Sequence, residues 1–225
     1  MKTILTSLLL FLSCAVFAQK KTVDIPIRIN YQNTDLQLGK IYYNEQIQDS
    51  IRFDKIRFYL SNIRLFQSEK ELENKGKKYQ LIDFSATEEP TLKIKFKSKK
   101  SPTHIAFDLG VDSLTNASGA HGGDLDPING MYWAWQSGYI FFKMEGYTPK
   151  STSRKQQFIY HIGGYQSPYN ALQNVSLDFK ENANIVLNLD NIIQQINFSE
   201  TSTIMSPSKE SVNFAKLIAN SFKVQ

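Results

Sequence analysis

The sequence predicts an all-β fold, namely a single antiparallel β-sandwich with immunoglobulin-like Greek-key connections and one or two short helices near the C-terminus. Three observations support this prediction. Apolar and polar residues alternate over many short segments, turn-forming residues recur at strand-plus-loop spacing, and helical periodicity is confined to the last part of the chain. No linker rich in proline, glycine or serine divides residues 19–225, so we expect one domain.

Residues 1–18 predict a secretory signal peptide. Lys2 precedes an uncharged apolar run, and Val16-Phe17-Ala18 has the small-residue pattern of a cleavage site. Cleavage after Ala18 is favoured over lipid attachment at Cys14, because apolar residues continue beyond that cysteine. Cys14 is the chain's single cysteine, so the mature chain has neither disulfides nor thiolate ligands. No later apolar run is long enough to be a transmembrane helix, so we expect a protein of the periplasm or outer cell surface.

The first half of the mature chain alternates with a period of two. Residues 22–32, "TVDIPIRINYQ", predict the first strand, in which Pro26 indicates an edge or a bulge. Residues 50–66, "SIRFDKIRFYLSNIRLF", predict one long strand or a strand pair with a break near Asp54. A charged hairpin tip is expected around residues 74–76, after which residues 79–82 return as a strand.

The second half predicts further strands and then helices. The strand segments are "THIAFDLGVD", "YIFFKMEGY", "QQFIYHIGGY", "NVSLDFK" and "NANIVLNL". Residues 189–198 predict a short helix. Residues 208–223 predict a C-terminal helix with Val212, Ala215, Leu217 and Ile218 on one face.

A lysine-rich segment, "LKIKFKSKK", predicts a solvated edge strand. Leu92, Ile94 and Phe96 alternate with lysines that would face water and discourage pairing with other chains. A nucleic-acid patch is the alternative, but no binding motif accompanies these lysines, so we expect no nucleic-acid partner.

The three histidines and two aspartates are the candidate metal ligands. His104 is expected to be an ordinary surface histidine. His121 lies in a glycine-rich loop that can aim a side chain, and His161 begins a glycine corner after a strand. Asp124 and Asp126 have the spacing of oxygen donors for calcium, although the full EF-hand loop is absent.

Two alternatives to metal binding remain for this region. Asp126 can instead cap a turn that ends at Gly130, and we prefer this interpretation. Trp133 and Trp135 are two residues apart, so on a strand they would face the same side, either in the core or as a stacking platform for sugar rings.

No catalytic motif accompanies these residues. The sequence lacks a nucleophile elbow, a metalloprotease helix motif and a phosphate loop. Glu145 with Asp124 or Asp126 could form a glycosidase pair, but nothing fixes the separation of the carboxylates. We therefore expect a protein that is not an enzyme.

The segments "GGDLDPINGMYWAWQSGYIFFKMEG", "FYLSNIRL" and "YHIGGY" resemble the MbnP-like family of secreted, methanobactin-associated copper proteins. The most specific block is LDP-x-x-GMYW-x-W-x-SGY, and the resemblance covers most of the mature chain. Where many relatives have "GHDLDP", this chain has "HGGDLDP", with the histidine at His121 and a glycine at Gly123.

This resemblance implies a β-sandwich that binds copper. In the family a tryptophan can be oxidised to kynurenine by a di-haem peroxidase-like partner, and the product joins histidines at the copper. An indole N–H can only donate, whereas the ring-opened aryl amine can be a ligand. The matching positions are Trp133 or Trp135, with Trp133 slightly favoured, and the imidazoles of His121 and His161.

The leading hypothesis is thus a periplasmic or cell-surface copper-binding protein in copper acquisition or homeostasis. One alternative is a non-catalytic carbohydrate- or calcium-binding module of the cell envelope, which would use the tryptophans and the two aspartates. A second alternative is a purely structural envelope protein whose aromatic block is a core corner.

Overall fold

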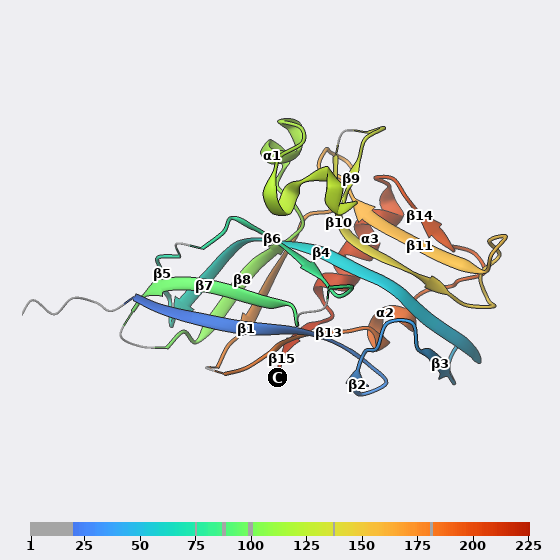
Figure 1. The fold of residues 1–225 in the computed structure, drawn as a ribbon, viewed down its shortest axis with the longest axis horizontal. Helices are drawn as coiled ribbons and strands as arrows, with labels where there is room; N and C mark the ends of the chain where they lie inside the picture. The colour runs from blue at the N-terminus through green and yellow to red at the C-terminus, as the bar shows by residue number, and fades with distance from the viewer. Residues whose placement is uncertain (1–19, 75, 87–88, 99–100, 137, 181) are drawn as a thin grey trace, which may run out of the picture.

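The computed structural model describes residues 20–225 except 75, 87–88, 99–100, 137 and 181. The predicted signal peptide, with Cys14, lies outside the described residues. The described chain is mostly β and forms two sheets, one of five strands and one of ten, which curl around a shared core (Figure 1). The predicted all-β, sandwich-like class is therefore confirmed.

The smaller sheet contains β1 (Lys20–Tyr31), β2 (Thr34–Asp35), β7 (Thr91–Lys97), β13 (Ile185–Asn188) and β15 (Phe222–Val224). The larger sheet contains β3 (Ile41–Asn44), β4 (Asp49–Gln67), β5 (Lys70–Leu72), β6 (Tyr79–Asp83), β8 (His104–Leu109), β9 (Tyr132–Trp133), β10 (Gly138–Tyr147), β11 (Gln157–Gly163), β12 (Gln173–Asp178) and β14 (Thr203–Ile204).

The described helices are α1 (Ser113–Ala117), α2 (Asp190–Ile193), α3 (Lys209–Ala219) and two 3-10 turns, η1 (Gly123–Leu125) and η2 (Pro127–Asn129). The two helices predicted near the C-terminus are present as α2 and α3. None of the helices in the described part of the chain has the length and apolar content that crossing a membrane requires.

Strand β1 follows its alternating pattern. Ile25, Ile27 and Ile29 are buried between the sheets, whereas the residues between them are half-buried or exposed. Pro26 lies at the point where β1 changes partner, from β7 at Thr91 to β13 at the next residue. Since proline has no N–H to donate, such a change of partner is a position that accommodates it.

Strand β4 is one continuous strand of nineteen residues, and it pairs with β10 on one edge. The predicted break near Asp54 is a bulge. Glu145 pairs with Lys55 and the next residue of β10 pairs with Phe53, so Asp54 has no partner in this ladder. The bulge bends β4 without ending it. The predicted return of residues 79–82 is confirmed, since β6 pairs with β4, but the tight turn lies earlier than the predicted 74–76, at residues 68–69, where β4 turns into β5.

The predicted sandwich is not entirely antiparallel. Strand β1 pairs with β13 in parallel, and so does β11 with β14. Parallel pairing needs a long connection, and most of the chain separates β1 from β13. Alternation within one strand reports which side is buried but not the direction of its neighbour, which is why this feature was missed.

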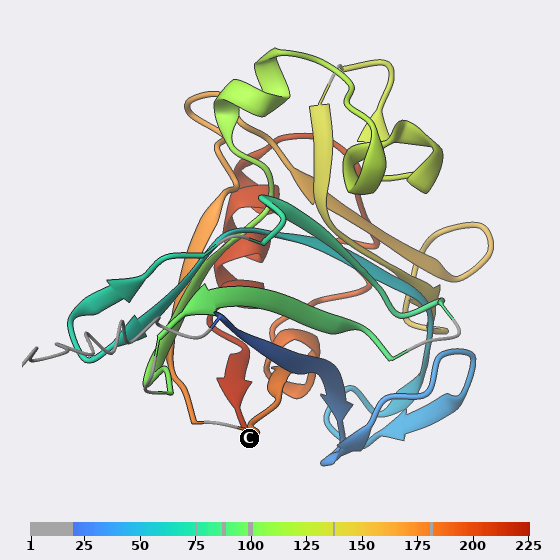
Figure 2. The ribbon, with the colours of Figure 1, turned by 60° about the vertical axis from the view of Figure 1, so that its left-hand side comes forward.

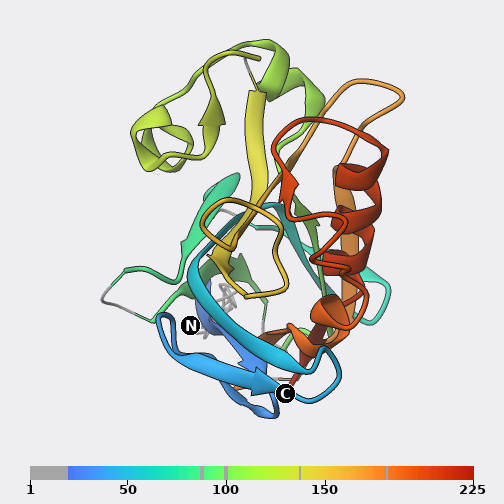
Figure 3. The ribbon, with the colours of Figure 1, turned by 90° about the vertical axis from the view of Figure 1, so that its right-hand side faces the viewer.

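Helix α3 lies along one side of the molecule, against β11 and β12 (Figure 3). Ser208 begins the helix by accepting a hydrogen bond from the Ser211 amide. Ala215 and Ile218 are buried, as their spacing predicts, while Phe214 is a third buried residue on this face. Burying this apolar face is what holds a helix of only eleven residues in place.

The short helical turns gather at one end of the molecule. Figure 2 shows α1, η1 and η2 above the edge of the larger sheet, next to β9 and the start of β10. The glycine-rich loop that contains His121 therefore lies at the same end as both tryptophans, and β11, which carries His161, ends there.

Candidate functional site

The β9–β10 hairpin sets the positions of both tryptophans. Trp133 pairs with Gly138 and is only 4% exposed, whereas Trp135 lies beyond the end of β9 and is 66% exposed. Their ring centroids are 6.1 Å apart at an angle of 49°. The prediction that one strand directs both indoles to the same side is wrong, because the strand ends at Trp133. The tilted rings do not form a flat stacking platform.

Trp133 covers a glycine of the neighbouring strand. A Cβ on Gly163 would lie 3.0 Å from Cζ3 and 3.1 Å from Cη2 of this indole, so the ring rests directly on the glycine backbone. The indole Nε1 is buried and has no hydrogen-bond partner among the described residues. A buried donor without an acceptor costs stability, so a native structure that retains one calls for an explanation.

His161 lies on β11 and is largely buried. Its Nε2 is 2.8 Å from Oε1 of Glu145 on β10, and Oε2 of the same carboxylate is 3.2 Å from Lys55 Nζ on β4. The hydrogen bond from His161, together with the nearby Lys55 charge, lowers the Glu145 pKa to about 2 despite partial burial. Glu145 is therefore ionised at neutral pH and can orient the imidazole.

His161 and Trp133 lie on the same face of the sheet. Gly163 follows His161 by two residues on β11, so their Cα–Cβ directions share one side of the strand. Two residues of strand span about 7 Å. The indole covers that side of Gly163, so it lies on the same face of β11 as the imidazole, while Glu145 is opposite Ile159, on the other side of His161 along the strand.

His121 is exposed in the loop between α1 and η1. Its Nε2 is 2.8 Å from Ser118 Oγ, and its backbone N–H donates to Tyr139 Oη at 2.9 Å. These partners are not shared with His161. Tyr139 nevertheless belongs to the same hairpin as Trp133, so one hairpin anchors the His121 loop and carries the indole on the face of the sheet that holds His161.

Space around the His121 loop is open. Gly119 and Gly123 have φ values of +92° and +69°, which favour glycine, and a Cβ at either would meet no atom within 4 Å. Side chains could therefore be added at these positions without a clash, although the positive φ values favour glycine.

The two aspartates of this region have structural partners. Asp124 lies 2.7 Å from Lys77 Nζ and accepts a hydrogen bond from the Leu81 amide. Asp126 accepts from the Ile128 amide, and Gly130 ends the turn with a φ of +67°. The turn interpretation of Asp126 is confirmed, and the metal-ligand roles of both aspartates stay predictions.

Two cations fix this corner to the sheet. Arg57 Nη1 donates to the Asn129 carbonyl at 2.9 Å, and Lys143 Nζ donates to the Gly130 carbonyl. Burial lowers the pKa of Lys143. Sequence reasoning did not single out either cation, although a lysine inside the apolar run "YIFFKMEG" indicates a buried polar partner.

The donor set limits what the site can bind without modification. The described residues contain no group of three or more histidine, cysteine, aspartate or glutamate side chains that could hold a metal ion. His104 is remote from the site, with Nε2 2.6 Å from Ser176 Oγ on β12. These residue types alone therefore form no complete ligand set around His161, and the buried Nε1 of Trp133, on the same face of the sheet, is a nitrogen without a partner among the described residues.

Comparisons with known proteins agree on one family. A family model described as MbnP matches residues 20–206. The solved structure of MbnP from Methylosinus trichosporium superimposes with a TM-score of 0.59 over 84% of this chain and 81% of that chain, at 15% sequence identity. At this identity the structural similarity shows the fold alone. No curated protein matches the chain.

Proposed function

The chain belongs to the MbnP family, and from this we propose that it is a secreted copper-binding protein that is not itself an enzyme. Family membership supports a methanobactin-associated, copper-related role in general and is associated with secretion. The finer proposal is that His161 and an oxidation product of Trp133 bind copper in the periplasm or at the cell surface, in copper acquisition or homeostasis.

The observation that carries the proposal is the buried, unpartnered Nε1 of Trp133, whose indole covers Gly163 on the same face of β11 as His161. An indole N–H cannot be a ligand as it stands, because its lone pair belongs to the aromatic ring. Oxidation to kynurenine would turn this nitrogen into an aryl amine. The same position would then supply a nitrogen donor on the face of the sheet that carries the His161 imidazole, and nitrogen donors suit copper.

Glu145 prepares His161 for this role. The ionised carboxylate can accept a hydrogen bond from Nε2–H, and in that tautomer Nδ1 is the nitrogen that can face a metal ion. Lys55 holds the other carboxylate oxygen and so restricts rotation of Glu145. This arrangement resembles the carboxylate–histidine pairs that orient metal ligands in other proteins.

His121 is proposed as the second imidazole. Its backbone is tied to Tyr139, six positions beyond Trp133 in the same hairpin region, while its side chain is exposed and its loop has open space around Gly119 and Gly123. Binding would require the ring to leave Ser118, which costs one exposed hydrogen bond.

Oxidation of Trp133 requires an external oxidant, for which we propose the di-haem peroxidase-like partner. The C2–C3 bond of the indole breaks, both carbons gain oxygen from peroxide that is reduced to water, and hydrolysis releases the formyl carbon as formate. Exposure of Trp135 beside the buried ring gives such a partner an aromatic surface to approach.

Copper titration of the mature protein, followed by calorimetry and by paramagnetic resonance of Cu(II), tests the proposal. We expect His161→Ala to weaken copper binding at least about tenfold and to change the nitrogen hyperfine pattern. His104→Ala is the matched control, because it removes an imidazole that is remote from Trp133. Copper binding that is equal in both variants would contradict the proposal.

A further inference from the structure

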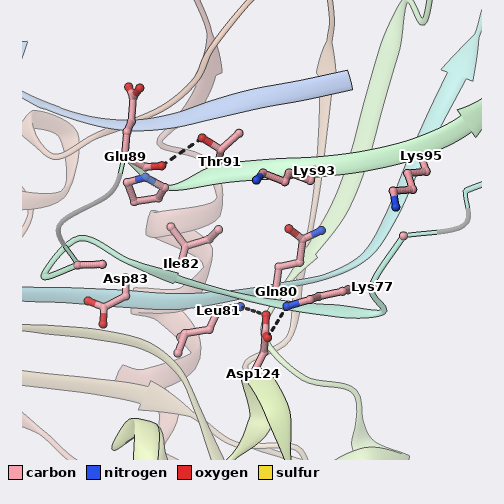
Figure 4. A pocket seen from close by; sticks show the side chains of 13 residues that line it. Lys77, Gln80, Leu81, Ile82, Asp83, Glu89, Thr91, Lys93, Lys95 and Asp124 are labelled. Atoms are coloured by element: carbon pink, nitrogen blue, oxygen red, sulfur yellow. Dashed lines mark hydrogen bonds and ion pairs between the residues drawn. The ribbon is translucent and has the colours of Figure 1, made fainter. Parts of the chain in front are cut away.

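A cleft of about 590 Å³ lies between β6 and β7, away from the tryptophans (Figure 4). The two strands are neighbours in the sequence but do not pair, because β6 pairs with β4 and β7 pairs with β1. The cleft is thus the seam at which the two sheets diverge. A bridge between Asn74 and Phe96 closes one end, and Pro90 lines it near the start of β7.

Two lysines that line the cleft form no salt bridge within the described part of the chain, and one of them, Lys93, is opposite Asp24 in the β1–β7 ladder. Lys77, Lys93 and Lys95 line the cleft. Lys77 is paired with Asp124, whereas Lys93 and Lys95 have no ion-pair partner within the described residues. The other carboxylates that line the cleft are already paired with arginines: Asp83 with Arg57 and Glu89 with Arg28.

The floor of the cleft contains a polar side chain whose amide opens into the cleft. Gln80 is only 8% exposed, and its side chain extends from β6 into the space between the two strands (Figure 4). No described residue forms a hydrogen bond with its side-chain amide. An amide both donates and accepts, so a bound molecule with matching groups would satisfy it.

Protection of a sheet edge does not account for these features. Lysines along an edge strand discourage pairing with other chains, and β7 is such an edge over most of its length. That role needs neither a hollow seam nor a polar side chain buried in it. It also does not explain why the side chain that opens into the seam at position 80 is an amide.

We propose that the cleft binds a small organic anion that carries both carboxylate and hydroxyl groups. Its carboxylates would meet Lys93 and Lys95, and a hydroxyl or carboxylate oxygen would pair with the Gln80 amide. The volume lies within the range of small-molecule sites. Hydroxycarboxylic acids and acidic sugars share this chemistry. The proposal does not depend on the proposed copper centre, because neither His161 nor Trp133 lines the cleft.

Binding is tested on the mature protein by calorimetry with citrate, digalacturonate, neutral digalactose and inorganic phosphate. We expect saturable binding of citrate, digalacturonate or both, and weakening as salt increases. Binding of only one of them identifies the source. Equal binding of digalactose or of phosphate, or no binding of either carboxylate at millimolar concentration, would overturn the proposal.

Variants locate the site. Lys93→Gln with Lys95→Gln should weaken carboxylate binding about tenfold, whereas Lys150→Gln with Lys155→Gln, an equal loss of charge in the exposed β10–β11 loop, should leave it unchanged. Equal effects of the two pairs would mean that only net charge matters, and the proposed site would be wrong.

Gln80→Leu provides a readout that a structural role would not give. Replacing an amide that has no partner among the described residues should preserve or raise the melting temperature of the free protein. The same change should remove the rise in melting temperature that the carboxylate probe produces. A Gln80→Leu protein that is destabilised without the probe, or that responds to it normally, would argue against a ligand for this amide.

Discussion

Glu145 and His161 face each other across the β10–β11 ladder, with 2.8 Å between Oε1 and Nε2. The pair is diagonal, because His161 is directly opposite Lys143 and Glu145 is two residues further along β10. The sheet therefore brings together, on one face, a largely buried imidazole and a partly buried carboxylate. Because Lys55 holds the second carboxylate oxygen, the imidazole has one preferred orientation.

Glu145→Gln should destabilise the protein at neutral pH. The substitution replaces charge-assisted bonds to His161 and Lys55 with neutral ones, and we expect the free energy of unfolding to fall by about 2 kcal/mol. Urea unfolding at pH 7 measures this change. Glu69→Gln, in an exposed turn, is the matched control and should be neutral within about 0.5 kcal/mol. Equal stability of the two variants would show that the pair contributes nothing.

Gly163→Ala should displace Trp133. The added Cβ would lie 2.6 Å from the Tyr139 carbonyl oxygen and 3.0 Å from the indole, so the backbone and the ring must shift. We expect this shift to lower the free energy of unfolding by about 1–3 kcal/mol. Tryptophan emission should move to longer wavelength as the ring becomes more exposed. Gly122→Ala adds the same methyl group where no atom lies within 4 Å, and it should leave both emission and stability unchanged. An unshifted Gly163→Ala spectrum would contradict the packing.

Asp112 should make stability depend on acid pH. Burial raises its pKa, but hydrogen bonds from Tyr79, the Thr115 amide and Lys78 outweigh burial and lower the pKa to about 2. A depressed pKa gives stability that is complete above the unfolded value of 3.8 and is lost as pH falls through about 2. Urea unfolding at several pH values measures this loss. In wild type the free energy of unfolding should fall between pH 3.8 and about pH 2, and this fall should be smaller in Asp112→Asn. An equal fall in the two proteins would refute this role.

Asp126→Ala tests the turn against the calcium alternative. Loss of the cap on the Ile128 amide should lower the free energy of unfolding by about 1 kcal/mol. The melting temperature should fall equally in calcium and in chelator, because the role of Asp126 in the turn needs no ion. A calcium-dependent rise in the wild type that is absent from Asp126→Ala would instead favour a calcium site.

Local patterns predicted most of the fold. Alternation placed Ile25, Ile27 and Ile29 in the core, and the Asp126 to Gly130 turn followed from its residues alone. The parallel pairing of β1 with β13 could not be predicted, since alternation contains no information on the direction or identity of a distant partner.

The site was predicted only in part. His161 and Trp133 were named from the sequence, but their placement on one face of β11 depends on Gly163, whose missing side chain makes room for the indole. The exposure of Trp135 depends on where β9 ends, which spacing does not reveal. The role of Glu145 depends on the β10–β11 register, and a single carboxylate in an apolar strand does not indicate its partner.

The two tryptophans should differ in oxidation. Conversion to kynurenine adds one oxygen and removes one carbon, so the intact mass of protein from a host with a di-haem peroxidase-like partner should rise by that difference. Trp133→Phe should abolish the rise, because this is the indole on the same face of the sheet as His161, whereas Trp135→Phe removes the exposed neighbour and should slow the conversion without preventing it. A mass change that survives Trp133→Phe and disappears in Trp135→Phe would assign the modification to the exposed ring.

Peptide mapping of each variant then identifies the oxidised residue directly. An unmodified mass in every variant would remove kynurenine from the proposed copper site while leaving His161 as a candidate ligand.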